Sequence, residues 1–363
     1  MVARATRSAS RAAQYEVSEC VGSIVDEIQR RWIAGELLND EGLRATRTSY
    51  DFAAQATGPL GSLSHDELGV IFDGLADPLR PIIAVALSGT CKGLRTPLRA
   101  VLQLLQHRHA RAQAVCGKVE TSCAVLREAK LLSSSSKRLD ADDMATLGMI
   151  LRTNGLPQLE GIELKGSGID DEGMVALCDG LGRGAAPSLR KFDVGYPYAG
   201  GAPGYKNNIG PVGAEALAAA LRRGAPPKLR ALNLNGNPIG KQGMAALATP
   251  LRKLPALQTL SLANCDIDDE AVATLLANLG KDDFHELYSF SLGRNKITDV
   301  GASKLVAALD AGGMPELRTH VCGCVRACDC IRQWAEFYAD VLIKGNPVSA
   351  SALRAVRASL EKR

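Results

Sequence analysis

Residues 229–251 read Leu-Arg-Ala-Leu-Asn-Leu-Asn-Gly-Asn-Pro-Ile-Gly-Lys-Gln-Gly-Met-Ala-Ala-Leu-Ala-Thr-Pro-Leu. Two periods of apolar residues follow one another in this stretch. Leu232 and Leu234 alternate, as in a strand with one buried face, whereas Gly243, Leu247 and Leu251 recur every four residues, as along one side of a helix. The stretch therefore predicts one short strand followed by one helix.

The same pattern returns along the second half of the chain, at intervals of about 28 to 30 residues except across one insertion. The copies begin at Leu159, Leu189, Leu229, Leu257 and Leu287, and a degenerate copy around Leu132 precedes them. One strand and one helix cannot bury their apolar sides alone, so we expect the copies to stack, with parallel strands inside and helices outside. An asparagine after the strand can bond backbone groups at the turn and would form a ladder between copies. It is present as Asn207, Asn237, Asn295 and Asn346.

The helical half of the pattern points to a family. Gly213-Ala-Glu-Ala-Leu-Ala-Ala-Ala-Leu221 and Gly301-Ala-Ser-Lys-Leu-Val-Ala-Ala-Leu309 resemble the helix of the ribonuclease-inhibitor class of leucine-rich repeats. The resemblance implies an α/β horseshoe over residues 126–363, with insertions at 195–206 and 318–338. It leaves the ligand open, because the same fold serves nuclease inhibitors, Ran GTPase-activating proteins and many sensors or adaptors.

The chain before residue 126 contains no copy of the repeat. We expect residues 1–15 to be disordered, although their arginines, alanines and serines also suit an organelle transit peptide, and residues 16–125 to form an all-α module. Within it, residues 60–100 contain an apolar pattern made of Leu63, Leu68, Ile71, Phe72, Leu75, Leu87 and Cys91. With this pattern the segment resembles an F-box, a helical segment that docks on a Skp-type adaptor of a ubiquitin ligase, and the resemblance implies that these seven residues contact the adaptor. The alternative is a helical cap that closes the open end of the repeats.

Composition favours a water-soluble protein of the cytosol or nucleus. The net charge of +4 over 363 residues is too small to indicate nucleic-acid or membrane binding, and no apolar run is long enough to span a bilayer. Ten cysteines are scattered along the chain, which fits reduced thiols. The one cluster, Cys322 to Cys330, has C-x-C spacings that would point the sulfurs to opposite sides of a strand. We therefore expect an insertion or a gene-model artefact there rather than a metal site.

No catalytic or cofactor-binding motif is present, so we expect a protein that is not an enzyme and uses neither cofactor nor metal. The repeated acids at the helix starts, such as Asp171 and Asp269, are expected to cap free amides. Function would then lie on the concave strand face, which is close to neutral in charge. Its candidate residues are Glu163, Lys165, Asp193, Asn233, Asn235, Ser261 and Ser291, with edge anchors Arg190, Arg230, Tyr288 and Arg294 and with Tyr196 from the first insertion.

Three functions fit these expectations. The first is a substrate receptor of a ubiquitin ligase, which joins the F-box-like segment to the repeats. The second is an interaction scaffold or sensor without ligase coupling. The third is a Ran-type GTPase activator or another small-GTPase regulator, a family that carries an acidic tail where this chain ends in Leu360-Glu-Lys-Arg363.

Overall fold

The computed structural model describes residues 76–81, 84, 92–134, 137–153, 155–182, 184–196, 206–277, 279–280, 283–317, 343 and 345–362. The chain divides into two compact units, Met1–Ala112 and Gln113–Arg363. Helix α5, Lys92–Lys118, begins in the first unit and ends in the second. The second unit contains the repeats and is described next.

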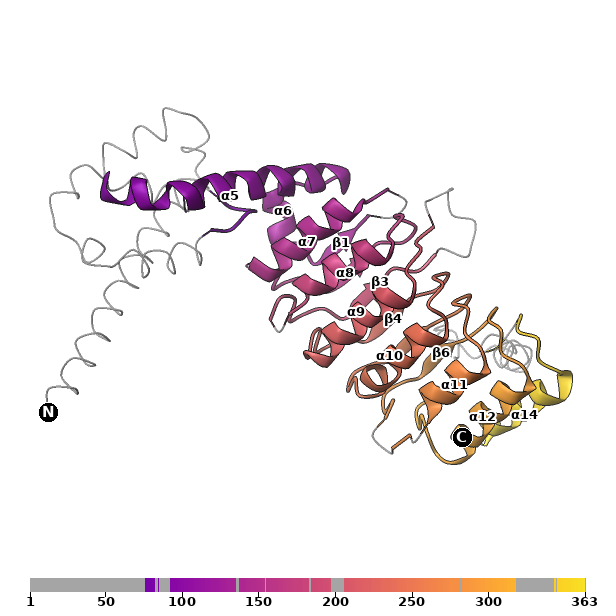
Figure 1. Cartoon of the computed structure of the whole chain (residues 1–363). Helices are drawn as coiled ribbons and strands as arrows, with labels where there is room; N and C mark the ends of the chain where they lie inside the picture. Colours follow the sequence, from indigo (N-terminus) through magenta and orange to yellow (C-terminus); the bar gives the residue numbers. More distant parts are fainter. Residues whose placement is uncertain are drawn as a thin grey trace, which may run out of the picture. The chain divides into compact units, whose positions relative to one another are not determined.

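Short strands and helices alternate through the second unit, and the strands form one six-stranded parallel sheet in sequence order. The strands are β1 Leu131–Ser133, β2 Gly161–Glu163, β3 Lys191–Asp193, β4 Ala231–Asn233, β5 Thr259–Ser261 and β6 Ser289–Ser291. The helices are α6 Cys123–Arg127, α7 Ala141–Thr153, α8 Asp171–Gly180, α9 Pro211–Arg222, α10 Gly240–Arg252, α11 Asp269–Leu276, α12 Asp299–Asp310 and α14 Ala350–Glu361. Each strand with the helix that follows it is called a coil below. Successive coils lie side by side along the unit (Figure 1).

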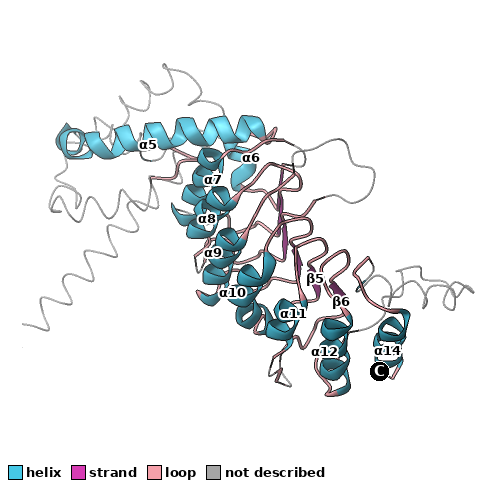
Figure 2. Ribbon diagram, turned by 45° about the vertical axis from the view of Figure 1, so that its right-hand side comes forward, coloured by secondary structure: helices cyan, strands magenta, loops and turns pink. Residues whose placement is uncertain are grey.

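The helices form one layer and the sheet forms the other (Figure 2). The middle residue of every strand points into the space between the layers and is buried: Leu132, Ile162, Phe192, Leu232, Leu260 and Phe290. These residues align across the sheet in register. Helix residues such as Leu247 and Leu251 are buried against them. The predicted strand-plus-helix repeat and its parallel α/β arrangement are therefore confirmed.

The degenerate first copy also forms a coil. Leu132 lies in β1, which pairs with β2, and Leu139, Leu147 and Leu151 are buried as in the regular copies. Ser134 occupies the place of the second strand leucine and is 2% exposed. The copy was hard to recognise in the sequence because of this polar substitution, yet backbone pairing keeps its register.

The asparagine ladder is confirmed by its hydrogen bonds. Asn207 Oδ1 accepts the N–H groups of Ser167 and Ile169, both at 2.9 Å, while its Nδ2 donates to the carbonyls of Leu164 and Val194 at 2.8 Å. Asn237, Asn295 and Asn346 also bond across to the preceding coil. Each of these amides, buried at Asn207, Asn237 and Asn295 and partly buried at Asn346, thus satisfies backbone groups of two coils, which fixes the spacing between them.

One ladder position holds a cysteine. Cys265 is fully buried, and its thiol donates to the carbonyl of Leu234 at 3.2 Å. Burial raises the pKa of this thiol to about 12, so it stays protonated and keeps its donor at neutral pH. In other coils the isoleucine N–H, such as that of Ile169, donates to the amide oxygen of the next ladder asparagine. A thiol lacks this oxygen, and the Ile239 N–H donates to the carbonyl of Asn237 at 2.8 Å instead.

Aspartates at the starts of the helices also connect neighbouring coils. Asp170 and Asp268 cap their own helices, as predicted, by accepting the N–H groups of Gly173 and Ala271. The residue after each cap, Asp171 or Asp269, accepts N–H groups of the following coil instead. Asp269 Oδ1 accepts the N–H groups of Thr298 and Gly301 in the following coil, at 2.8 and 2.9 Å. Each such acid therefore supplies a cap to its neighbour's helix, which offsets that helix's dipole.

Candidate interaction surface

The first and third residues of each strand point away from the helices, and so does the residue two positions beyond the strand. We call this surface the open face of the sheet. In strands β2 to β6 its polar members are Glu163, Lys165, Lys191, Asp193, Asn233, Asn235, Thr259, Ser261, Ser289 and Ser291. The sheet brings together all seven strand residues that the sequence predicted for a binding surface.

Strands β2 and β3 carry all the charges of this set. Lys191 Nζ lies 2.5 Å from Glu163 Oε1, and Lys165 Nζ lies 3.1 Å from Asp193 Oδ2. Asp193 also accepts the N–H of Gly195 at 3.2 Å and is only 3% exposed. We call these four residues the charged block. Its two ion pairs cross between neighbouring strands, so its charges neutralise one another.

Strands β4 to β6 carry small, uncharged side chains, which we call the neutral block. Its polar members are Asn233, Asn235, Thr259, Ser261, Ser289 and Ser291. Asn233 Oδ1 accepts the N–H of Asn235 at 3.0 Å, and Asn235 Oδ1 accepts the N–H of Ala263 at 2.7 Å. Both Nδ2 groups lack a partner among the residues that the structure describes.

The hydroxyl groups of the neutral block are also unused. In the described ranges, Thr259, Ser261, Ser289 and Ser291 make no side-chain hydrogen bond. They are half-buried rather than fully exposed. The neutral block therefore offers donors and acceptors whose hydrogen bonds a ligand can complete.

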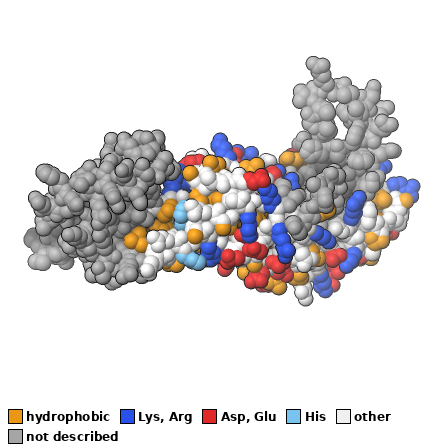
Figure 3. Space-filling model, turned by 90° about the horizontal axis from the view of Figure 1, so that it is seen from above, with side chains coloured by type: hydrophobic (Ala, Val, Ile, Leu, Met, Phe, Trp, Pro, Cys, Tyr) orange, Lys and Arg blue, Asp and Glu red, His pale blue; other side chains and the backbone are white. Residues whose placement is uncertain are grey.

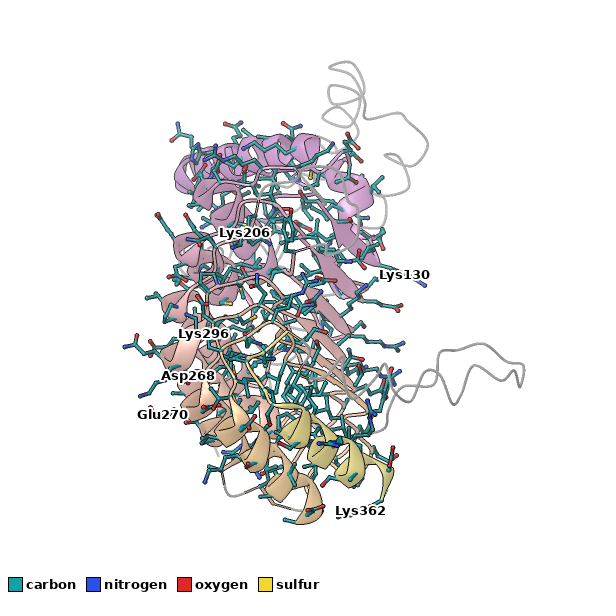
Figure 4. The ribbon with its side chains drawn as sticks, turned by 90° about the vertical axis from the view of Figure 1, so that its right-hand side faces the viewer. Lys130, Lys206, Asp268, Glu270, Lys296 and Lys362 are labelled. Carbon is teal, nitrogen blue, oxygen red and sulfur yellow. The ribbon has the colours of Figure 1, made fainter. Side chains whose placement is uncertain are left out.

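A row of longer side chains lines the edge at which the strands begin. Arg190 lies 3.9 Å and Lys130 4.0 Å from Glu160, distances at which surface ion pairs contribute little. Arg230 and Lys228, at the start of β4, are exposed and have no ionic partner in the described part of the chain. Figure 4 shows Lys130 on one side of the unit and Lys206 and Lys296 on the opposite side, where Asp268 and Glu270 also lie.

The remaining predicted anchors lie in three different places. Tyr288 stands at the start of β6, in the same row as Arg230. Tyr196 is 37% exposed and donates its backbone N–H to the carbonyl of Asn235 at 2.8 Å, which sets it beside the neutral block. Arg294 belongs instead to the turn after β6, where it has a φ of 57° and lies against Gly345. The structure therefore groups Tyr288 and Tyr196 with the open face and separates Arg294 from it.

Three polar residues of the open face were missing from the predicted set: Lys191, Thr259 and Ser289. Each is the first residue of its strand, two positions before a residue that was predicted. The same two-residue alternation that identified the third positions was sufficient to find them.

Comparison with known protein families agrees with this geometry. A family model described as Leucine Rich repeat matches residues 225–248, 253–276 and 287–306. This part of the chain consists of leucine-rich repeats. The three matched leucine-rich repeats contain β4, β5 and β6, and therefore the whole neutral block. The charged block belongs to the two coils before them.

Several predictions fall outside the described residues. These are the F-box-like contacts Leu63, Leu68, Ile71, Phe72, Leu75, Leu87 and Cys91, the tail at residues 1–15, and the cluster from Cys322 to Cys330. They stay predictions.

The cysteines of the described residues are free thiols: Cys116, Cys123, Cys178 and Cys265. Among the described residues no cluster of three or more His, Cys, Asp or Glu side chains has a metal-binding arrangement. None of the helices described is both long enough and apolar enough to cross a bilayer. Basic and acidic side chains are interspersed on the surface seen in Figure 3.

Proposed function

We propose that the chain binds another protein through the open face of its leucine-rich repeat sheet, which forms the concave side of a ribonuclease-inhibitor-type horseshoe. One observation carries the proposal: three adjacent strands present side-chain donors and acceptors that have no partner in the described chain. These groups are accessible to solvent, so a partner can replace the water that hydrates them with direct or water-bridged hydrogen bonds.

The proposal is non-catalytic. The acids that recur at the helix starts are the residues most suggestive of acid–base chemistry, and Asp171 and Asp269 accept backbone N–H groups from the next coil. A carboxylate whose oxygen accepts two backbone N–H groups stabilises the contact between coils. Free thiols, including the buried Cys178 and Cys265, support a reducing compartment such as the cytosol or nucleus.

The test compares the open face with the helix layer. The full chain is used to capture partners from cell extract, beside Ser261→Arg and Ser291→Arg on the open face. Val212→Arg and Val300→Arg serve as matched controls, because these valines are 57% and 60% exposed on α9 and α12. We expect the open-face variants to lose a partner that the control variants retain, with circular dichroism unchanged in all four. Retention of every partner by the open-face variants would contradict the proposal.

The resemblance of residues 60–100 to an F-box supports a narrower version, in which the captured protein is a ubiquitin-ligase substrate. A chain that lacks residues 60–100 would then lose a Skp-type adaptor and keep its other partners. If neither chain binds an adaptor, the ligase function is excluded and the scaffold function stands.

A further inference from the structure

The charged block and the neutral block of the open face differ in how many of their side-chain donors and acceptors are already paired within the protein. In the charged block Lys165 and Lys191 are engaged by Asp193 and Glu163, within 3.1 and 2.5 Å. Each carboxylate neutralises much of the charge of its lysine, which weakens the attraction of either cation for an acidic ligand. Asp193 is also covered by its neighbours. The charged block is therefore a poor place for a ligand to make polar contacts.

The neutral block is arranged in two rows that cross the strands. Ala231, Thr259 and Ser289 align in one row, and Asn233, Ser261 and Ser291 align in the other. Neighbouring strands are about 4.8 Å apart, so three strands span roughly 10 Å, the length of about three residues of extended chain. The side chains are short, which lets a ligand backbone approach closely. Amide and hydroxyl groups can bond both the carbonyl and the N–H groups of such a backbone.

The charge beside the neutral block is uneven. At its β4 end Arg190 and Arg230 are neighbours in the edge row, with the Arg230 N–H donating to the Arg190 carbonyl at 2.7 Å, and the exposed Lys228 lies two residues before Arg230. Glu160 is the acid that pairs with this group, at 3.9 Å from Arg190. At the β6 end Glu286 accepts a hydrogen bond from Gln258 at 3.2 Å. The edge is thus positive beside β4 and carries a carboxylate beside β6.

From these contacts we infer that the neutral block binds an extended peptide segment of a partner protein, with an aspartate or glutamate of that segment on Arg230. The inference rests on the proposed function and names the partner's chemistry. The two Nδ2 groups of Asn233 and Asn235 donate to peptide carbonyls, and the hydroxyls of β5 and β6 complete the row. Arg230 supplies a charge-assisted bond that fixes the direction of the peptide.

Asn235 offers a sharp test, because its two side-chain atoms have different tasks. Oδ1 holds the N–H of Ala263, and Nδ2 is free for a ligand. Asn235→Asp keeps an oxygen for Ala263 while it replaces the donor with a negative charge. The substitution should therefore leave the fold intact and remove acidic-peptide binding.

The probe is a phage-displayed library of random linear peptides, selected on the full chain. We expect peptides with an acidic residue to be enriched and to bind more weakly as salt increases. In fluorescence polarisation with a selected peptide, Arg230→Gln should weaken binding about tenfold and Asn235→Asp at least as much. Ser291→Ala should weaken it about threefold. Arg222→Gln, an exposed arginine of α9, is the matched control and should leave affinity unchanged.

Enrichment of neutral or basic peptides, or equal losses in Arg230→Gln and Arg222→Gln, would overturn the inference. Failure here is separable from failure of the proposed function. If no acidic peptide is selected while Ser261→Arg still loses its captured partner, this inference is wrong and the binding function stands. If Ser261→Arg keeps every partner, the binding function itself is wrong.

Discussion

Asn207 lies inside the turn that follows its strand, whereas Asn233 and Asn235 lie on the open face of the sheet. The first is 1% exposed and makes four hydrogen bonds to backbone groups of two coils. The other two are half-buried and each uses only its oxygen. The same side chain thus contributes to stability in the turn interior and remains available for binding on the open face. The difference depends on whether neighbouring backbone groups surround both ends of the amide.

The largest effect is expected in the turn interior. Asn207→Ala would leave buried N–H and carbonyl groups of two coils without partners, and should lower the free energy of unfolding by about 3 kcal/mol. Urea unfolding measures the change. Asn208→Ala is the control, because Asn208 is exposed in the next position and should change stability by less than about 0.5 kcal/mol. Equal losses in the two variants would show that the ladder does not hold the coils.

A pH effect is expected where the ladder contains a thiol. Burial raises the pKa of Cys265 from 9.0 in an ordinary setting to about 12, so the folded chain keeps a proton that the unfolded chain loses. Its contribution to stability is complete below pH 9 and falls as pH rises towards 12, by about 1.4 kcal/mol per pH unit.

Cys265→Asn tests this reasoning, because an asparagine restores the amide of the other coils and has no proton to lose. Between pH 9 and 11 the variant should lose about 2 kcal/mol less stability than the unmodified chain, as measured by urea unfolding at each pH. Cys178→Ala should reduce the alkaline loss in the same direction, since burial also raises the pKa of Cys178 to about 12. An identical pH dependence in all three chains would rule out the thiols as its cause.

The caps between coils should contribute less than the buried ladder. Asp269→Ala removes the acceptor for the N–H groups of Thr298 and Gly301, and should lower the free energy of unfolding by about 1 to 2 kcal/mol. The neighbouring Glu270 is the control, because its pair with Lys241 is exposed on both sides. Thermal unfolding of Asp269→Ala and Glu270→Ala distinguishes them, and a greater loss in Glu270→Ala would refute the capping role.

The smallest stability effect is expected on the open face. Asn233→Ala removes one bond, to the N–H of Asn235, and should cost about 0.5 kcal/mol or less. It should nevertheless weaken binding of the partner, which separates the two uses of asparagine most directly. Urea unfolding and peptide binding are measured on the same preparation. A loss of stability similar to that of Asn207→Ala would remove the distinction between the two regions.

The ladder and the strand register were predictable from the chain because they depend on local spacing. The order of apolar residues in 229–251 places Leu232 in a strand and Leu247 on a helix, and repetition then requires the coils to stack. The cross-coil reach of Asp269 was harder to foresee. The sequence indicates a cap at the helix start, but the recipient lies in the next coil, 29 residues away at Thr298.

The division of the open face was also beyond the sequence. Glu163 and Lys191 are distant in the chain, and only strand pairing brings them to 2.5 Å. Their residue types alone describe a surface of mixed polarity. The register of the sheet decides which charges neutralise one another and which amides remain free.

The sequence by itself determined the repeating strand and helix, the parallel order of the coils and the positions of the buried asparagines, because each follows from periodicity within one copy. The tertiary structure decided which polar groups are already paired and which remain free for a partner. That outcome depends on distances between side chains of neighbouring coils, and no single copy of the repeat contains those distances.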